Sequence, residues 1–137
     1  MKHTNQPSRV AKRICALFIA LSMSNAWAVD ASSQMATFAQ EAKTTPNAAK
    51  GEALFNNKHG SDWSCASCHG TPPTSEGKHA STSKPISALA PAFTPTRFTD
   101  QAKSDKWFKR NCNDVMKREC TTAEKADVLA YLISLKK

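Results

Sequence analysis

The sequence CASCH, residues 65–69, combines two thiols and an imidazole at a spacing that suits covalent attachment of haem. Two thiols three positions apart reach the vinyl groups on one edge of a porphyrin, and the histidine that follows points its imidazole at the iron. In an exported chain, C-x-x-C-H is the attachment motif of a c-type haem. We therefore predict that one haem c is bound covalently through Cys65 and Cys68, with His69 as the proximal iron ligand.

The first 28 residues have the pattern of a secretory signal peptide. Four basic residues precede an apolar run over residues 14–23, and Ala26 and Ala28 form a small-x-small cleavage site. The run is about ten residues long, shorter than the roughly twenty needed to span a bilayer, although a retained N-terminal anchor is the alternative. We predict a signal peptide over residues 1–28, export to the periplasm and one mature domain over residues 29–137.

Removal of this leader changes the charge and cysteine balance. The net charge falls from +8 to +4, because four of the 19 basic residues and none of the 11 acidic residues lie in the leader. This modest charge, without a basic and aromatic stripe, argues against nucleic-acid binding. No second apolar segment is long enough to cross a membrane, so we expect no membrane span in the mature chain. Cys15 leaves with the leader, and an oxidising compartment will pair, alkylate or metallate the four cysteines that remain.

Two other interpretations of those cysteines stay open at this point. A structural zinc site would use all four, although seven residues separate the second pair and zinc sites usually separate both pairs by two to four. A thioredoxin-like redox pair would need alternating strands and helices, and the sequence shows no run of strands. The four cysteines are Cys65, Cys68, Cys112 and Cys120.

The segment KRNCNDVMKREC, residues 109–120, is the expected source of the sixth iron ligand. Of the two methionines in the mature chain, Met35 precedes the first expected core helix and Met116 lies in this segment. Methionine is the usual sixth ligand of electron-carrying cytochromes c, so residue types alone favour Met116 over an asparagine. The histidines nearest the motif are expected to be solvated on Lys- and Ser-rich loops: His59 and His79.

A helix is predicted on the N-terminal side of the motif, within TTPNAAKGEALFNNK from Thr44 onward. Thr45 is its expected N-cap, and Pro46 suits the first helical position. Gly51 and Phe55 are four residues apart and share one face, where the missing side chain of Gly51 lets another helix approach closely. The preceding residues 35–43 are expected to add a helical turn or two, without an assigned role.

A second helix is predicted at the C-terminal end, where TTAEKADVLAYLISLKK begins with a capping box between Thr121 and Glu124. Helices from the two ends of a chain that cross beside a haem are the pattern of class I c-type cytochromes. We therefore predict an all-α, class I cytochrome c-like fold. Between the helices, residues 71–98 contain five prolines and should form a long loop, in which a carbonyl such as that of Pro91 could accept the second ring proton of His69. The apolar positions of the second helix follow a helical period: Val128, Tyr131, Leu132 and Leu135.

The block RFTDQAKSDKWFKRNCNDVMKREC, followed by TTAEKADVLAYL, resembles the sphaeroides haem protein family. The resemblance covers residues 97–132 together with the haem motif and the first helix. Members of this family are exported class I cytochromes with an asparagine as sixth ligand. The resemblance implies that Asn111 binds the iron and that Cys112 and Cys120 form a disulfide. The chain departs from the family at residues 116–117, where Met-Lys replaces Ile-Gly and places a competing thioether five residues from Asn111.

The same resemblance implies a function. An amide oxygen is a hard, weak donor that suits ferric iron better than ferrous iron, so reduction should release Asn111 and allow a diatomic gas (dioxygen, nitric oxide or carbon monoxide) to bind. The family suggests a dihaem c-type cytochrome or a membrane cytochrome b as electron donor. Six lysines are candidates to attract an acidic partner: Lys58, Lys78, Lys84, Lys103, Lys106 and Lys109.

Three other functions remain as alternatives. With Met116 on the iron, the chain would be an ordinary electron-transfer cytochrome c that stays six-coordinate in both oxidation states. A haem enzyme that turns over dioxygen, nitric oxide or peroxide is a second alternative, although the distal segment lacks the His and Arg pairing of peroxidases and we assign no catalytic residue. A zinc-stabilised binding module is the third.

Overall fold

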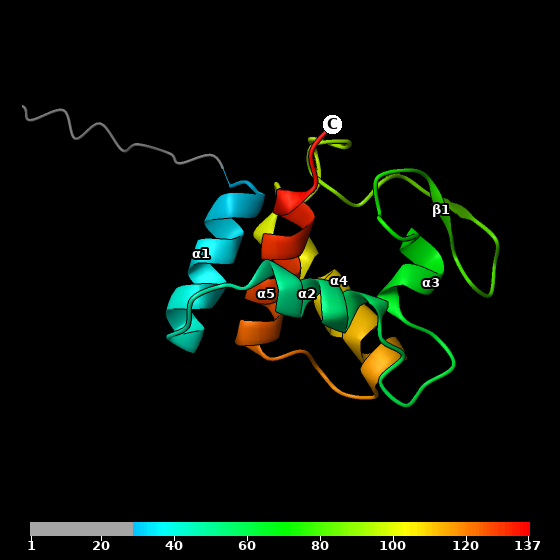
Figure 1. Ribbon diagram of the computed structural model, residues 1–137, viewed down its shortest axis with the longest axis horizontal. Helices are drawn as coiled ribbons and strands as arrows, with labels where there is room; N and C mark the ends of the chain where they lie inside the picture. The colour runs from blue at the N-terminus through cyan, green and yellow to red at the C-terminus, as the bar shows by residue number, and fades with distance from the viewer. Residues whose placement is uncertain (1–28) are drawn as a thin grey trace, which may run out of the picture.

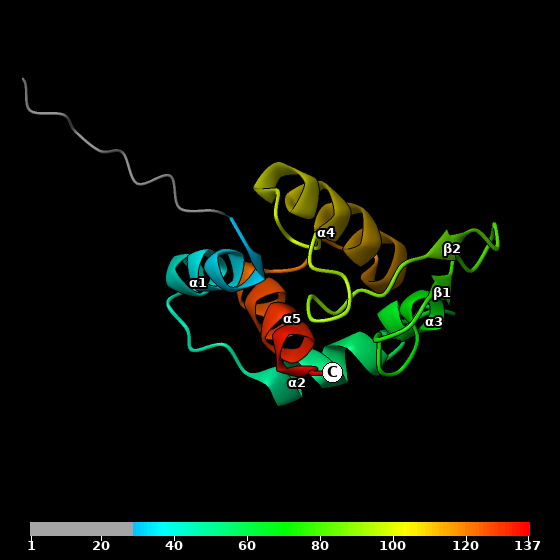
Figure 2. The same cartoon turned by 90° about the horizontal axis from the view of Figure 1, so that it is seen from above.

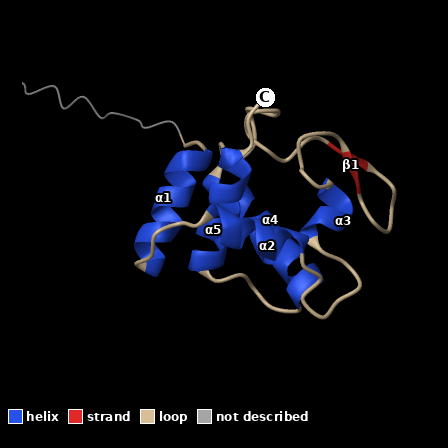
Figure 3. Cartoon of the chain, viewed as in Figure 1, coloured by secondary structure: helices blue, strands red, loops and turns tan. Residues whose placement is uncertain are grey.

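The computed structural model describes residues 29–137, so the predicted signal peptide lies outside the described residues. Most of the regular secondary structure in this part of the chain is helical, as Figures 1 and 3 show. The helices are α1 (Ala31–Ala42), α2 (Ala48–Asn56), α3 (Cys65–His69), α4 (Gln101–Met116) and α5 (Thr122–Ser134), and the strands are β1 (Gly77–Lys78) and β2 (Pro85–Ile86).

Helix α5 is the centre of the molecule, flanked by α1 and α2 (Figure 2). The structure confirms its capping box, in which Thr121 and Glu124 exchange side-chain to backbone hydrogen bonds. Leu135 is half-buried and forms the C-cap, so it lies just beyond the predicted helical period. The residues that α5 buries in the core are Ala126, Val128, Leu129, Tyr131 and Leu132.

The crossing of α2 and α5 depends on Gly51. A Cβ atom at this position would overlap the backbone carbonyl of Asp127 in α5, so the two helices approach as closely as the sequence predicts. The predicted N-cap, Thr45, is wrong: Asn47 caps α2, and its side chain accepts a hydrogen bond of 3.0 Å from the backbone N–H of Lys50. The Asp127 carboxylate accepts from the Asn47 backbone N–H at 2.7 Å, which ties the start of α2 to α5.

Helix α1 is longer than expected and contributes to the core. It begins with a capping box between Asp30 and Ser33, continues to Ala42 and packs along α5, where Phe38 is only 3% exposed. The amide nitrogen of the buried Gln34 donates a hydrogen bond of 2.8 Å to the Phe98 carbonyl. Helix α1 therefore also holds the end of the long loop, just before α4 begins.

The long loop contains one small element of regular structure that the sequence did not predict. Strands β1 and β2 pair antiparallel, with Gly77 opposite Ile86, and form a two-stranded hairpin. A Cβ atom at Gly77 would overlap the Cys68 carbonyl, so the hairpin lies directly against α3. Figure 2 shows α4 on the far side of α5 from α2. Among residues 29–137, no helix is both long and apolar enough to cross a membrane.

Candidate haem site

A cavity of about 1240 Å³ brings the predicted cofactor-binding residues together. Small-molecule pockets usually measure about 300–1,000 Å³, so this volume suits a group as large as a porphyrin. Three elements supply most of its walls: α3, the long loop and α4. The predicted residues on these walls are Cys65, Cys68, His69, Asn111, Cys112, Met116 and Cys120.

Local hydrogen bonds hold the helix that carries the motif. Ser64 is the N-cap of α3: its hydroxyl accepts from the Ser67 backbone N–H at 3.2 Å, and the Ser67 hydroxyl accepts from the Ser64 backbone N–H at 2.9 Å. These bonds satisfy backbone donors that a helix of only five residues leaves unpaired. The S-x-x-S pattern of residues 64–67 is a sequence signal for this capping box, which we did not predict.

The two thiols of the motif are free and half-buried. Burial raises the pKa of Cys65 to about 11, and the nearby Cys68 adds to this increase. A redox-active thiol needs a lowered pKa, and the described strands form only the small hairpin, so the structure argues against a thioredoxin-like site. Two free thiols at the wall of a large cavity fit covalent attachment to a bulky group.

The zinc interpretation is wrong for the described residues. Cys112 and Cys120 form a disulfide with a Cα–Cα distance of 5.6 Å, so their thiols cannot bind a metal. Residues 29–137 contain no cluster of three or more His, Cys, Asp or Glu side chains that could hold a metal ion. The disulfide joins the end of α4 to the residue just before the N-cap of α5.

His69 has the protonation state that a metal ligand requires. Burial, with the positive charge of Arg97 as a second cause, lowers the pKa of His69 to about 4. The imidazole is therefore neutral near pH 7, and neutral imidazole is the form that binds metals. The ring of Phe55, with its centroid 6.2 Å from that of His69, packs the imidazole against the α2–α5 core.

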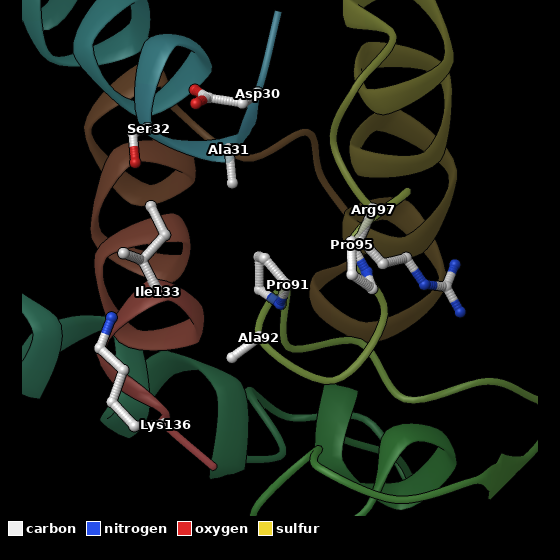
Figure 4. A pocket seen from close by; sticks show the side chains of 9 residues that line it. All are labelled: Asp30, Ala31, Ser32, Pro91, Ala92, Pro95, Arg97, Ile133 and Lys136. Carbon is white, nitrogen blue, oxygen red and sulfur yellow. The ribbon is translucent and has the colours of Figure 1, made fainter.

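The expected acceptor for the second ring nitrogen of His69 is not present. His69 Nδ1 is buried and has no hydrogen-bond partner, so the prediction that a carbonyl such as that of Pro91 accepts from it is wrong. Pro91 instead lines a smaller pocket of about 270 Å³ between α1, α5 and the loop (Figure 4). Among residues 29–137 no hydrogen bond involves the other ring nitrogen of His69 either, so that nitrogen is available to bind another group.

Helix α4 separates the two asparagines of the distal segment. Asn111 is half-buried and lines the cavity, whereas Asn113 is exposed and does not. Two residues along an α-helix correspond to a rotation of about 200°, which places the two side chains on opposite faces. The Asn113 amide nitrogen donates to the Lys109 carbonyl at 2.7 Å, while among residues 29–137 no hydrogen bond involves the Asn111 amide.

Two other candidate ligands also lie on the cavity wall. Met116 is half-buried, and its sulfur lies 3.6 Å from that of Cys120. His79 is half-buried rather than solvated, because the hairpin holds it beside α3, where the Ala80 backbone N–H donates to Cys68 Sγ at 3.3 Å. The geometry therefore leaves Met116 as an alternative to Asn111.

The remaining candidates lie away from the cavity. His59 is exposed, as expected, and its Nε2 lies 2.7 Å from the Leu54 carbonyl oxygen. Met35 packs against the hydrophobic core rather than the cavity. Neither residue lines the cavity, which leaves the residues of α3, α4 and the hairpin as possible ligands.

Charged and aromatic side chains surround the cavity. Of the six lysines considered above, Lys84 and Lys103 line it, while the exposed Lys109 pairs with Glu119 at 3.0 Å. Trp63 and Trp107 also line it and are 44% and 45% exposed, respectively. Neither Trp63 nor Arg97, another cavity residue, was predicted to line the site. Two sequence features could have indicated that they line the cavity. Trp63 lies just before the motif, and Arg97 is an arginine in a loop whose other basic residues are lysines.

Comparisons with other proteins place these features in a family. A family model described as "Domain of unknown function (DUF1924)" matches residues 41–132. The chain is 54% identical over 69 residues to "Cytochrome c-type protein SHP" of Cereibacter sphaeroides, a match that covers 50% of this chain and 53% of that protein. It is 39% identical over 93 residues to "Cytochrome c''" of Methylophilus methylotrophus, which covers 65% of each chain. The chain thus spans about half the length of the curated SHP protein and somewhat more of cytochrome c''.

Solved structures give the same relationship. The structure of oxidized SHP, described as an oxygen-binding cytochrome c, matches with a TM-score of 0.73 at 40% identity and covers 80% of this chain and 100% of that chain. The crystal structure of oxidized cytochrome c'' from Methylophilus methylotrophus matches with a TM-score of 0.70 at 32% identity, covering 78% and 95%, respectively. These matches confirm the predicted all-α, cytochrome c-like fold.

Homology to these cytochromes c implies that covalently bound haem c is the group that the cavity receives. The free thiols of Cys65 and Cys68, the neutral imidazole of His69 and the size of the cavity all fit that group. The family model spans more than half of the chain. The chain therefore belongs to the DUF1924 family and is a homologue of cytochrome c-type protein SHP.

Proposed function

We propose that this chain is an exported monohaem c-type cytochrome that accepts electrons and binds a diatomic gas when reduction releases Asn111. The observation that supports this function best is the placement of Asn111 on the wall of the same cavity as Cys65, Cys68 and His69. Dioxygen is the first gas to test, because the SHP structure is described as that of an oxygen-binding cytochrome c.

Each residue of the motif has a separate role. Haem c, when bound, supplies a one-electron redox centre and a binding position for a small gas. Cys65 and Cys68 would hold it through thioether bonds, formed if each S–H group adds across one of its vinyl groups. His69 binds the iron through its neutral imidazole, and the packing of Phe55 keeps that ring in place.

Asn111 is suited to exchange because nothing else holds its amide. Among the described residues no hydrogen bond involves this amide, so release from the iron breaks no protein contact that the structure records. Its oxygen is a hard and weak donor, which favours the ferric state over the ferrous state. A gas then has access to the position on the cavity side of α4 that Asn111 leaves.

Export and electron delivery complete the proposal. The signal-peptide pattern over residues 1–28 directs the chain to the periplasm, where oxidising conditions favour the disulfide of α4. The electron donor is a dihaem c-type cytochrome or a membrane cytochrome b. Lys84 and Lys103, which are exposed residues on the cavity wall, are positioned to attract an acidic donor.

The test is a set of optical spectra of the purified holoprotein in both oxidation states. Asn111→Ala is expected to convert the ferric iron from low spin to high spin and to leave the ferrous spectrum nearly unchanged. Asn113→Ala is the matched control, because its amide points away from the cavity, and it is expected to leave both spectra unchanged. Dioxygen or carbon monoxide binding to the reduced protein tests the gas site directly.

An ordinary electron-transfer cytochrome with Met116 on the iron is the second candidate, because Met116 also lines the cavity. In that case the oxidised protein shows the weak far-red methionine-to-iron band, and the reduced protein stays six-coordinate and binds no gas. Met116→Leu then produces the high-spin ferric spectrum that we expect from Asn111→Ala. That result would replace Asn111 by Met116 as the sixth ligand.

A further inference from the structure

Trp107 lies at the opening of the large cavity, on the wall that carries Asn111. Its side chain lines the cavity and is 45% exposed, so one part of the ring faces the cavity and another part faces solvent. An aromatic ring that stays half in water gains only part of the stability that full burial would give. Packing of the core therefore does not account for the position of this ring.

Trp107 and Asn111 are neighbours on one face of α4. They are four residues apart in the helix, a spacing that places two Cβ atoms about 5–6 Å from each other. Helical side chains lean towards the N-terminus of their helix, so the Asn111 side chain leans towards Trp107. The indole ring therefore stands between solvent and the position that Asn111 leaves when it is released.

Stacking, rather than hydrogen bonding, holds the indole ring in place. The guanidinium carbon of Arg110 lies 5.5 Å from the ring centre, and Arg110 Nε lies 4.0 Å from the Asp114 carboxylate. Among residues 29–137 no hydrogen bond involves the indole N–H of Trp107. An exposed cation–π contact shifts an equilibrium by a factor of only about two to five, so the ring can swing aside.

The helix itself is held more firmly than this ring. Phe108, the next residue, packs with its ring centre 5.9 Å from that of Phe38 and 6.3 Å from that of Phe98. Rotation of α4 would break both contacts, so the helix cannot turn to open the cavity without disturbing the core. Movement of the Trp107 side chain is the less costly way to open this side of the cavity.

We propose that Trp107 is the gate through which a diatomic gas enters and leaves the position beside Asn111, and that Arg110 holds this gate closed. The inference rests on the gas binding proposed above. A gate raises the barrier for entry and for exit by the same amount, so it slows association and dissociation by one factor and leaves the affinity unchanged. A residue that touches the bound gas would instead change the affinity.

The experiment measures carbon monoxide binding to the reduced holoprotein. Flash photolysis at a series of carbon monoxide concentrations gives the association rate, and displacement by nitric oxide gives the dissociation rate. Trp107→Ala is expected to raise both rates by the same factor, and Trp107→Phe, which keeps a smaller ring, should fall between it and the wild type. Arg110→Gln keeps the indole but removes its stacking partner, so we expect both rates to rise about two- to fivefold.

Trp63→Ala is the matched control. Trp63 also lines the cavity and is 44% exposed, but it precedes α3, the helix that carries His69. We expect this variant to bind carbon monoxide at the rates of the wild type. All four variants should also keep the ferric spectrum of the wild type, because the gate does not hold the sixth ligand.

Four results would overturn the gate. They are unchanged rates in Trp107→Ala, a change confined to one of its two rates, a changed ferric spectrum in that variant, and an equal acceleration in Trp63→Ala. A reduced wild-type protein that binds no carbon monoxide would refute the gas site itself. That failure is distinct from a failure of the gate alone, in which the wild type binds carbon monoxide and Trp107→Ala binds it no faster.

Discussion

The two walls of the cavity are held by different kinds of contact. On the His69 side, the backbones of α2 and α5 touch at Gly51, and the hairpin touches α3 at Gly77. Phe55, which is 1% exposed, fills the space between His69 and Tyr131, with centroid distances of 6.2 Å and 5.6 Å. This wall is a continuation of the hydrophobic core.

The Asn111 side is attached mainly through side chains. One end of α4 is joined to the segment before α5 by the Cys112–Cys120 disulfide. Its middle is held by the Phe108 ring, which lies edge-on to Phe38 at 5.9 Å, and by an ion pair between Asp105 and Lys125 at 3.3 Å. None of these attachments of α4 is a close approach of two backbones like the one at Gly51.

This difference matches the roles proposed for the two ligands. A proximal histidine that stays bound in both oxidation states needs a rigid support, and the α2–α3–α5 core supplies one. A distal ligand that is released on reduction needs a support that holds its helix in place without filling the space around the side chain. The disulfide and the Lys125 contacts meet that need, because they anchor α4 at points other than Asn111.

The largest effect is expected from filling the contact on the rigid side. Gly51→Ala places a methyl group on the Asp127 carbonyl, a backbone atom that can move only if α2 and α5 separate. We expect a loss of about 3 kcal/mol in the free energy of unfolding, at the upper end of overpacking costs. Chemical denaturation of the ferric holoprotein measures this loss. Ala53→Leu enlarges an exposed position of the same helix and is expected to change stability by less than about 0.5 kcal/mol.

The rigid side was also the more predictable from sequence, because its signals are local. The Thr121–Glu124 capping box, the apolar period of α5 and the close approach at Gly51 all follow from residues within two helices. The N-cap of α2 was mispredicted although its signal is local, because Asn47 is a preferred N-cap residue and bonds to Lys50 three positions on. The role of α1 in the core was missed because it depends on packing against α5, which lies far along the chain.

On the distal side, the sequence did not predict which side chains of α4 face the cavity. Residue types alone favoured Met116, and the family resemblance favoured Asn111, but neither indicates which side chains of α4 face the cavity. The orientation of α4 places Asn111 inward and Asn113 outward, and it also retains Met116 on the wall.

Loss of the disulfide is expected to produce the second largest effect. Replacing Cys112 and Cys120 together by alanine removes a short closed loop, which corresponds to about 2.5 kcal/mol in the chain-entropy model. Because this brace holds the end of α4, we also expect a larger high-spin fraction in the ferric spectrum. Gly51→Ala should lower stability without that spectral change while the protein remains folded. A disulfide-free variant with a fully low-spin ferric spectrum would show that the brace does not position Asn111.

A smaller effect is expected where Lys125 of α5, whose side chain is only 17% exposed, contacts the middle of α4. Its ammonium group lies 4.9 Å from the ring centre of Phe38 and 5.9 Å from that of Phe108, in addition to its ion pair with Asp105. Lys125→Met retains the aliphatic length but loses these contacts, and we expect a loss of about 1 kcal/mol. Thermal unfolding measures it. Lys109→Met removes the exposed pair with Glu119 and should cost less than about 0.5 kcal/mol, so equal losses would contradict an anchoring role for Lys125.

The smallest effect concerns the turn between the disulfide and α5, and it depends on pH. Hydrogen bonds from Arg118 to Glu124, at 2.7 Å and 2.6 Å, together with one from the Thr121 backbone N–H, lower the pKa of Glu124 from 4.5 to about 2. A carboxyl group with a lowered pKa in the folded state stabilises that state above pH 4.5, and this contribution disappears as the pH falls towards 2.

Glu124→Gln should therefore flatten the loss of stability between pH 4.5 and 2 while changing little of the slope above that range. The gain at neutral pH is modest, because Arg118 is half-exposed and solvent screens the pair. Urea denaturation at a series of pH values measures the slope. If the turn also helps to hold α4, the ferric high-spin fraction of the wild type will rise as the pH falls from 4.5 to 2. The high-spin fraction of Glu124→Gln will already be higher than that of the wild type at pH 4.5, and it will change less over this range. A high-spin fraction that follows pH equally in both proteins would show that the anchoring of α4 ends at the disulfide and does not extend to this ion pair.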